Sequence, residues 1–294
     1  MYSNLVLSGG ALKTITILGA VKYLEELNIL KDFKQFIGTS AGAIISFLII
    51  IGYSVNQIKN IFFNEIINIT NINFENITNF IDDYGIDDSS INKNILEKYL
   101  FKKINQNDIT FIEFTKKFGK NLIITGSNLT TRELDYFNIN TSPNMSVITA
   151  LLITSCVPMI YKPITYNDCV YVDGAIYNNF PFKYFEDKHN DTLGIYIDSH
   201  FSNKNETFIS YIINIIYSIM NKITYDNIVK NNYNICCIVL EESKQKELEF
   251  SFDTLEVNVN NDKLKDMYNY GYKFFKDYFN NILEENEKKY NELL

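Results

Sequence analysis

A serine flanked by glycines is the first candidate for chemistry in this sequence. Ser40 lies in Gly38-Thr39-Ser40-Ala41-Gly42, a G-x-S-x-G pattern between two apolar segments. Where such a pattern joins a strand to a helix, the sharp turn exposes the serine hydroxyl, and small neighbours leave room for the strained backbone. The first amides of the following helix can also stabilise a developing negative charge. The pattern indicates a nucleophile, although alone it is not specific, because small residues often join a strand to a helix.

An aspartate further along the chain is the candidate base. Asp173 ends an apolar run and is followed by Gly174 and Ala175. A carboxylate held in a turn at the end of a strand is well placed to accept a proton. The same residues are equally typical of a hairpin or an Asx turn. Taken by itself, this motif leaves both interpretations open.

A glycine-rich segment, Ser8-Gly9-Gly10-Ala11-Leu12-Lys13, directly follows the first apolar run. Glycines at such a position let backbone N–H groups point outward as donors, which suits an oxyanion hole or a phosphate cradle. An ordinary tight turn between a strand and a helix would have the same composition. A dinucleotide-binding fingerprint is a poor match, because it requires glycine where Ala11 and Thr14 stand.

Apolar periodicity predicts the elements that must position these motifs. Residues 4–7 are expected to form a buried strand, 13–27 a helix, 33–37 a second strand, and the residues after Ser40 a helix to Ile51. A further helix is expected over 147–155, and further strands over 122–125, 133–138, 170–172, 193–197 and 235–240. Strands alternating with helices through short links are typical of a mainly parallel α/β sheet.

Two long segments near the C-terminus have the spacing of amphipathic helices. The apolar residues of the first are Ile209, Ile212, Ile213, Ile216, Ile219 and Met220, and those of the second are Leu264, Met267, Tyr268, Phe274, Phe275, Tyr278 and Ile282. Such stripes usually pack on a sheet, and we favour a core role for the first, although it could instead dock on a membrane or line an acyl channel. We expect one domain over 1–294, with a motif-bearing core over about 5–197, a helical cap over 54–118, and C-terminal helices over 206–294 packed on that core.

Composition and charge narrow the class of protein. The 294 residues carry a net charge of −8 and give a pI near 5.0. This argues against a nucleic-acid partner, because sequence-independent binding needs a basic face. The longest apolar run, 43–51, is too short to span a bilayer, which needs ~20 residues. Cys156, Cys169, Cys236 and Cys237 lack metal-ligand spacing, so we expect reduced thiols, no metal and a cytoplasmic compartment.

Taken together and in this order, the motifs resemble the patatin-like phospholipase family. The likeness covers about residues 5–52 and 120–197. Its blocks are Leu7-Ser8-Gly9-Gly10, Ile37-Gly38-Thr39-Ser40-Ala41-Gly42-Ala43, Ala150-Leu151-Leu152-Ile153-Thr154-Ser155-Cys156-Val157-Pro158, Tyr171-Val172-Asp173-Gly174-Ala175 and Asn178-Asn179-Phe180-Pro181. Several blocks in a fixed order are far more specific than any one of them.

The resemblance implies a three-layer αβα sandwich around a mainly parallel sheet, with a catalytic Ser–Asp dyad. By motif position, Ser40 matches the nucleophile and Asp173 the base, while Gly9, Gly10 and Ala11 match the oxyanion loop. The activity implied is hydrolysis of fatty-acyl esters in phospholipids or neutral lipids through a serine acyl-enzyme, without a cofactor. The substrate would be met at a membrane or lipid-droplet surface, by a cytoplasmic protein with peripheral membrane contact.

Two alternatives remain at this stage. Ala11 and Thr14 stand where the family usually has glycine, and loss of an oxyanion donor costs ~10²–10³ in rate, so a weak or inactive lipid-binding relative is one alternative. The other is a Ser-His-Asp hydrolase that uses His189 or His200. Against this triad, only one strand is predicted before the strand that leads to Ser40, and His189 lies in a polar run typical of a solvated loop.

Overall fold

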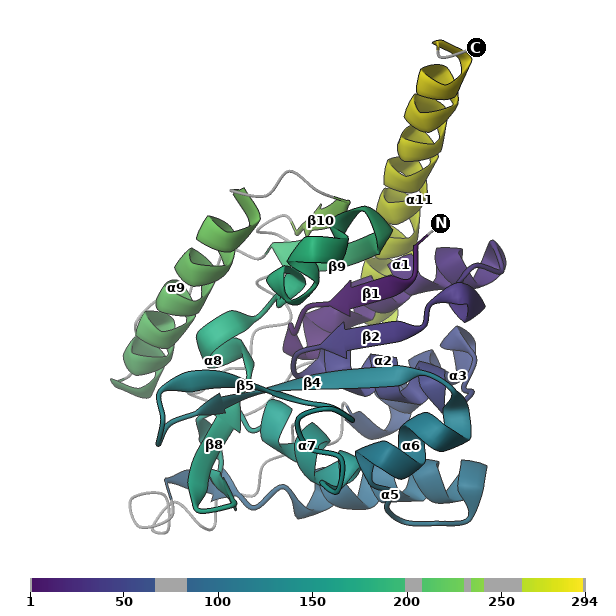
Figure 1. The fold of residues 1–294 in the computed structure, drawn as a ribbon. Helices are drawn as coiled ribbons and strands as arrows, with labels where there is room; N and C mark the ends of the chain where they lie inside the picture. Colours follow the sequence, from purple (N-terminus) through teal and green to yellow (C-terminus); the bar gives the residue numbers. More distant parts are fainter. Residues whose placement is uncertain (1, 67–83, 199–207, 230–233, 241–260, 293–294) are drawn as a thin grey trace.

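A mostly parallel sheet forms the centre of the molecule (Figure 1). The computed structural model describes residues 2–66, 84–198, 208–229, 234–240 and 261–292. Within them, eight strands form one sheet in the order β10-β9-β1-β2-β4-β8-β7, with β5 paired to β4 beside this path. The strands are β1 (Asn4–Leu7), β2 (Gln35–Gly38), β4 (Asn121–Asn128), β5 (Glu133–Phe137), β7 (Ile164–Tyr166), β8 (Cys169–Asp173), β9 (Thr192–Asp198) and β10 (Ile235–Val239). From β10 to β4 all neighbours are parallel, whereas the β4–β5, β4–β8 and β7–β8 pairs are antiparallel.

Helices flank this sheet, and the predicted αβα architecture is confirmed. They are α1 (Ile15–Glu26), α2 (Ala41–Ile50), α3 (Val55–Ile61), α5 (Ser90–Ile104), α6 (Phe111–Phe118), α7 (Val147–Thr154), α8 (Ala175–Asn178), α9 (Phe208–Val229) and α11 (Asn261–Glu292). Further helical segments, which are 3-10 or π-helical, are η1 (Ala11–Thr14), η2 (Leu30–Asp32), η3 (Phe62–Ile66) and η6 (Phe182–Asp191). A separate parallel pair joins β3 (Gly85–Asp87) to β6 (Met159–Tyr161).

The two faces of the sheet bury different sets of side chains, because successive residues of a strand point to opposite faces. On β1, Leu5 and Leu7 belong to the larger core, whereas Val6 belongs to a smaller one. The smaller core contains Ile37, Ile123, Phe180, Phe182, Phe185 and Tyr196 beside Val6. The η6 segment contributes Phe182 and Phe185 to this smaller core on one face of the sheet. Helices α1, α2, α7 and α11 contribute to the larger core on the other face.

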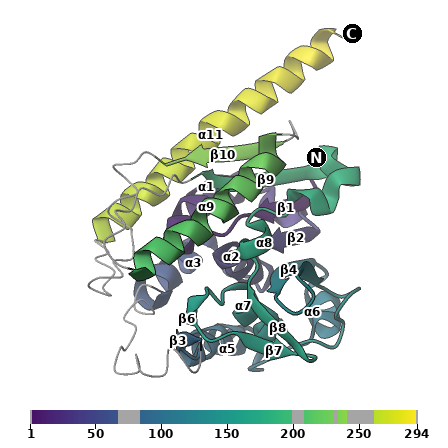
Figure 2. The ribbon, with the colours of Figure 1, turned by 90° about the vertical axis from the view of Figure 1, so that its left-hand side faces the viewer.

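The register of the parallel strands brings the predicted motifs to one edge of the sheet. Leu7 of β1 is paired with Gly38 of β2, and Gly38 is paired with Ile124 of β4. Two residues further along β4, Gly126 is paired with Asp173 of β8. The glycine-rich loop after β1, the turn after β2 and Asp173 consequently lie together at the carboxyl ends of the strands, which Figure 2 faces.

Helices α1 and α11 approach each other so closely that two glycines are required. A Cβ atom added to Gly19 of α1 would lie 2.0 Å from the backbone oxygen of Tyr268. One added to Gly271 of α11 would lie 1.9 Å from the backbone oxygen of Thr16. Neither clash can be relieved by a side-chain rotation, because the atoms that would be struck are backbone atoms. The C-terminal helix is thus joined to the first helix through backbone contact.

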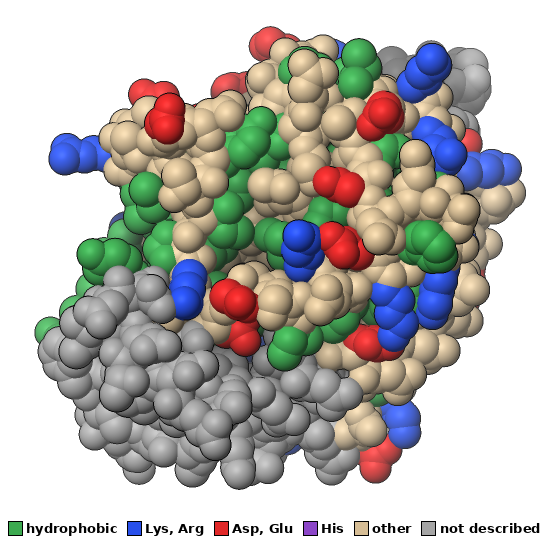
Figure 3. All heavy atoms as spheres, turned by 90° about the horizontal axis from the view of Figure 1, so that it is seen from below, with side chains coloured by type: hydrophobic (Ala, Val, Ile, Leu, Met, Phe, Trp, Pro, Cys, Tyr) green, Lys and Arg blue, Asp and Glu red, His purple; other side chains and the backbone are tan. Residues whose placement is uncertain are grey.

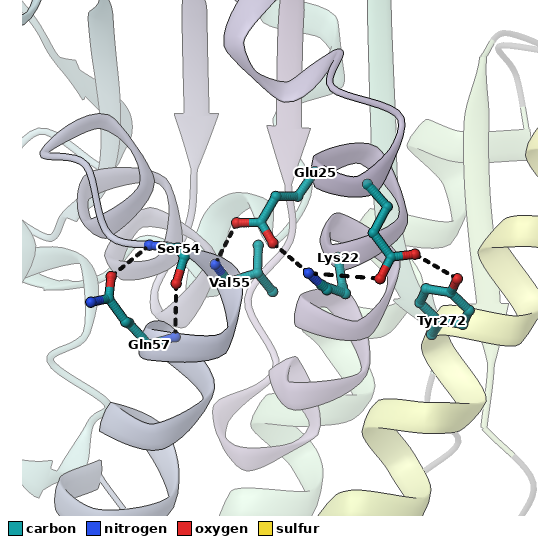
Figure 4. Close-up of polar contacts among 7 residues, drawn as sticks. Lys22, Glu25, Ser54, Val55, Gln57 and Tyr272 are labelled. Atoms are coloured by element: carbon teal, nitrogen blue, oxygen red, sulfur yellow. Dashed lines mark hydrogen bonds and ion pairs between the residues drawn. The ribbon is translucent and has the colours of Figure 1, made fainter.

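A chain of polar contacts at the end of α1 joins the same helices to α3 (Figure 4). Glu25 accepts a hydrogen bond of 2.8 Å from the backbone N–H of Val55, and Lys22 Nζ lies 2.7 Å from the other Glu25 oxygen. Lys22 also lies 3.7 Å from Glu26, which accepts a hydrogen bond of 2.7 Å from Tyr272 of α11. Because these ion pairs are partly exposed to solvent, each is expected to contribute at most about 1 kcal/mol to the stability of the fold.

Several details differ from the sequence-based expectation. The segment 54–118 contains β3 as well as α3, α5 and α6, and its residues 67–83 lie outside the described residues. Strands β6 and β7 were not predicted; each is only three residues long, too short to produce a periodic pattern. In the first C-terminal stripe, Ile216 and Met220 are half-buried, but Ile219 is 55% exposed, so its expected core position is wrong. No helix in the described ranges is both long and apolar enough to cross a bilayer.

The contact between α1 and α11 gives a test of the fold. Ala is favoured over Gly in a helix, yet Gly271→Ala is expected to lower the free energy of unfolding by about 1–3 kcal/mol, because the new methyl group must push the helices apart. Asn269→Ala, an exposed position in the same helix, serves as the control and should change it by less than about 0.5 kcal/mol. Urea unfolding followed by circular dichroism measures both. If both substitutions changed the free energy of unfolding equally, the close contact between α1 and α11 would not be required for stability.

Candidate active site

Ser40 sits on the sharp turn between β2 and α2. Its φ of 51° lies in the region that side chains other than glycine rarely adopt. The turn is forced by close packing: a Cβ on Gly42 would lie 2.5 Å from the Ser8 backbone oxygen, and one on Gly38 would lie 2.5 Å from the Ala43 nitrogen. These two glycines therefore let α2 start directly against the ends of β1 and β2. The serine is left at the N-terminus of α2, where the helix dipole favours negative charge.

Asp173 meets this serine directly. Ser40 Oγ donates a hydrogen bond of 2.8 Å to Asp173 Oδ2 across 133 residues of sequence, so the predicted contact is confirmed. The other carboxylate oxygen accepts 2.8 Å from the backbone N–H of Ala175 at the start of α8. Ser40 is 8% exposed and Asp173 only 3% exposed. The hydroxyl and the carboxylate thus form a fixed pair that is nearly closed to water.

Burial changes the acidity of this carboxyl group. It raises the pKa of Asp173 from 3.8 to about 7, because a charged carboxylate loses its hydration inside the protein. The hydrogen bonds from the Ala175 amide and the Ser40 hydroxyl oppose this shift, since both donate to the ionised form. A carboxylate with a pKa near neutrality can take up a proton far more readily than an exposed aspartate.

Three buried threonine hydroxyls support the turn, and sequence reasoning did not single them out. Thr154, at the end of α7, accepts 2.9 Å from the backbone N–H of Ser40. Thr39 and Thr125 share a hydrogen bond of 2.9 Å between their hydroxyls, and Thr125 lies 3.5 Å from Thr154. Thr154 does lie in a block that carried the resemblance, but nothing in its spacing indicated a contact with Ser40.

The glycine-rich loop reaches the same place, with one difference from the expected arrangement. The N–H of Gly9 already donates 3.3 Å to the Asn179 backbone oxygen, whereas no acceptor in the described chain takes the N–H of Gly10 or Ala11. Gly9 also has no room for a side chain, because a Cβ would lie 2.6 Å from Asn179 Oδ1. Ala11 adopts a φ of 47°, a strained conformation for alanine, and keeps its N–H as a donor.

The other sequence-based candidates are distributed as follows. His189 lies in η6, with Nδ1 3.0 Å from the Glu186 backbone oxygen, and His200 lies outside the described residues. In the described chain, neither Ser40 nor Asp173 is hydrogen-bonded to a histidine. Within the same ranges, no group of three His, Cys, Asp or Glu side chains is placed to hold a metal ion. Among the cysteines, which are free thiols, Cys156 and Cys236 are buried.

An αβα sandwich that pairs a turn serine with a buried aspartate at the carboxyl ends of its strands places these groups where α/β folds carry their active sites. The particular family follows from the sequence. The family model described as patatin-like phospholipase matches residues 5–186, and the chain belongs to this family. The expectation from the sequence motifs is thereby confirmed.

Two viral proteins and one bacterial structure resemble the chain. A protein of Invertebrate iridescent virus 6 named "Probable lipid hydrolase" is 36% identical over 193 residues, covering 64% of this chain and 65%, less than two thirds, of that protein. An uncharacterised protein of Acanthamoeba polyphaga mimivirus is 26% identical over 266 residues, covering 85% of this chain and 86% of that one. The structure of VipD from Legionella pneumophila has a TM-score of 0.58 at 16% identity, covering 94% of this chain and 66% of VipD, and supports the fold alone.

Removing the buried charge should alter how stability depends on pH. The folded pKa near 7 lies above the ordinary 3.8, so between these values the folded state binds more protons than the unfolded state, and stability falls as pH rises. Asp173→Asn keeps the shape without the charge. Its unfolding free energy, relative to wild type, should therefore be higher at pH 8 than at pH 5. Asp168→Asn, at an exposed turn, is the control. A difference for Asp173→Asn that is independent of pH would contradict the burial of a titrating carboxyl group.

Proposed function

We propose that this chain is a lipid acyl hydrolase that cleaves fatty-acyl esters of phospholipids or neutral lipids, with Ser40 as nucleophile and Asp173 as general base. The observation that carries the proposal is the hydrogen bond of 2.8 Å from the serine hydroxyl to the buried carboxylate. Family membership supports the lipid ester as the substrate class. The direct hydrogen bond from Ser40 to Asp173 favours a dyad over a triad, because a triad would place a histidine between the serine and the carboxylate.

The acylation step follows from the contact between the two side chains. Ser40 Oγ bonds to the ester carbonyl carbon while its proton passes to Asp173 Oδ2, which already accepts that hydrogen bond. The tetrahedral intermediate then breaks the bond between the carbonyl carbon and the ester oxygen. The proton held by Asp173 moves to that oxygen, and the alcohol product leaves. An acyl group remains on Ser40.

Stabilisation of the intermediate falls to the loop after β1. We assign the oxyanion donors to the N–H groups of Gly10 and Ala11, because that of Gly9 has an acceptor and that of Ser40 is held by Thr154. The N-terminus of α2 adds a favourable dipole at the same place. Water then attacks the carbonyl carbon of the acyl-enzyme while Asp173 takes a proton from the water. The bond between that carbon and Ser40 Oγ breaks, Asp173 returns the proton to Oγ, and the fatty acid leaves.

We further infer that the protein meets its substrate in the cytoplasm, at the surface of a membrane or lipid droplet. Four free thiols, two of them buried, fit a reducing compartment. Fatty-acyl lipids are insoluble as single molecules, so the enzyme must act where they assemble. Incubating the purified protein with a mixed panel of phospholipids and triglycerides, followed by lipid-class profiling, would identify the substrate class. If no lipid in the panel were hydrolysed, this result would count against the proposal.

Substitution of the dyad tests the proposed chemistry. Ser40→Ala removes the nucleophile and Asp173→Asn removes the proton acceptor, so each should lower kcat/KM for p-nitrophenyl butyrate by roughly 10³-fold or more. His189→Ala, the matched control for a triad, should stay within about twofold of wild type. Hydrolysis near the wild-type rate in Ser40→Ala would refute the central assignment.

Labelling with a fluorophosphonate separates an enzyme from an inactive relative, because only an activated serine reacts. We expect wild type to be labelled and Ser40→Ala not to be. The alternative is a weak or inactive lipid-binding protein. It is motivated by Ala11, because its φ of 47° is a strained conformation for alanine in the loop that is proposed to stabilise the oxyanion. It would be supported if wild type bound lipid without being labelled.

The pH dependence of the rate tests the identity of the base. Asp173 must be ionised to accept the proton, and its pKa lies near 7, so kcat/KM for a soluble ester should rise with pH to a midpoint near this value. At pH 5 only roughly one molecule in a hundred has an ionised Asp173, and the rate should fall by about that factor relative to pH 8. A flat profile between pH 5 and pH 8 would exclude this carboxylate as the titrating base.

A further inference from the structure

The outward face of α9 is rich in large apolar side chains, which is unusual for a surface helix. Of the thirteen large hydrophobic side chains exposed in the described chain, four lie on this helix, and no other element carries more than two. They are Tyr211, Ile215, Ile219 and Tyr225, with exposures of 48%, 39%, 55% and 57%. At 100° per residue these positions fall on one side of the helix. An exposed apolar face of this kind marks an interaction surface.

The opposite side of α9 faces the proposed active site. The helix packs against α8, which begins two residues after Asp173. Tyr217 lies on the side of the helix opposite these exposed residues. Burial, and to a smaller extent the charge of Asp173, raises the pKa of Tyr217 to about 12, which is consistent with this side of α9 facing the dyad. In Figures 1 and 2, α9 lies across the carboxyl ends of the strands, on the side where the dyad is found. One helix therefore joins the reacting groups to an apolar surface.

The charge pattern of α9 indicates what this face would bind. Residues 208–221 contain no charged side chain, and Lys222 and Asp226 are the only ones in the whole helix. Lys222 is exposed on the same side of the helix, and its Nζ lies 6.0 Å from the centre of the Tyr225 ring. An anionic membrane attracts clusters of lysine and arginine, which this face lacks, and the chain carries a net charge of −8. A zwitterionic or neutral surface suits it better.

Other exposed apolar residues have different surroundings. The face that carries α5 and β8 mixes basic and acidic side chains with hydrophobic ones (Figure 3). Ile91 on α5 and Ile112 on α6 are 49% and 47% exposed, as much as Ile215 and Ile219, but they lie on separate helices. They are matched in side chain and exposure and therefore serve as controls.

We propose that the outward face of α9 docks on a zwitterionic lipid surface, with the ring and methyl groups of Tyr211, Ile215, Ile219 and Tyr225 inserted among the acyl chains. This inference rests on the proposed function, because the lipid substrate is the reason to expect a lipid surface. Docking through this face holds the dyad on the far side of the same helix at the lipid boundary. The tyrosine hydroxyls and Lys222 suit the head-group level, since their polar ends can stay hydrated.

Vesicle binding tests the docking separately from catalysis. In a Ser40→Ala background, which leaves lipids intact, binding to phosphatidylcholine vesicles is measured by co-sedimentation. The double substitution Ile215→Asp and Ile219→Asp should lower the partition coefficient by roughly tenfold or more, because two inserted side chains become charged. The matched pair Ile91→Asp and Ile112→Asp should change it by less than about twofold. Vesicles containing phosphatidylglycerol should bind no more tightly than phosphatidylcholine alone.

Activity completes the test with Ser40 intact. The α9 double variant should lose hydrolysis of phosphatidylcholine vesicles by a similar factor while keeping p-nitrophenyl butyrate hydrolysis within about twofold, which also shows that it folds. Unchanged vesicle binding, equal loss in the control pair, or much tighter binding to anionic vesicles would overturn the docking proposal. So would a dimer, seen by light scattering, that the α9 substitutions dissociate. Absence of any ester hydrolysis by wild type would instead refute the proposed function, whatever the binding result.

Discussion

The hydrogen bond between Ser40 and Asp173 depends on a buried carboxylate, and much of the surrounding structure serves to hold it. Water would solvate the charge and lower the pKa toward 3.8, so a base that titrates near neutrality requires an enclosed site. Enclosure in turn requires that the remaining carboxylate oxygen find a donor, which the start of α8 provides through the Ala175 amide. The carboxyl group is thus kept basic by burial and kept in place by two donors.

Parallel strand register brings the two residues together. Leu7, Gly38 and Ile124 lie at one level of three neighbouring strands, and β8 joins β4 just beyond that level. Close backbone contacts at Gly38 and Gly42 then allow α2 to begin where β2 ends. The strained conformation of Ser40 is offset by this packing and by the Thr154 hydroxyl, which takes its N–H. Local strain at Ser40 is therefore supported by elements that are distant in the sequence.

The part of the chain beyond the family match contributes to the same architecture. The match ends at residue 186, yet β9 pairs with β1 at the centre of the sheet, and α11 contacts α1 through backbone atoms. Helix α9 also lies beyond the match and lies next to α8. The matched region contains Ser40, Asp173 and the glycine-rich loop, whereas the residues after it add β9 and β10 to the sheet.

The sequence by itself determined the local elements and the family. Apolar runs predicted β1, β2, β4, β8, β9 and β10 to within a few residues, and small residues around Ser40 predicted the turn, because these features depend on near neighbours along the chain. The assignment of Ser40 and Asp173 as site residues likewise came from motifs.

Only the tertiary structure decided which groups meet. The 2.8 Å contact between Ser40 and Asp173, the acceptor taken by the Gly9 N–H and the partnership of Thr154 with Ser40 all join residues that are distant in sequence. Periodicity could not orient α9 either, since apolar residues occur on both of its sides and Ile219 proved to be exposed. Side-chain patterns report local geometry, whereas pKa, strain and exposure depend on strand register and helix packing, which the folded chain alone fixes.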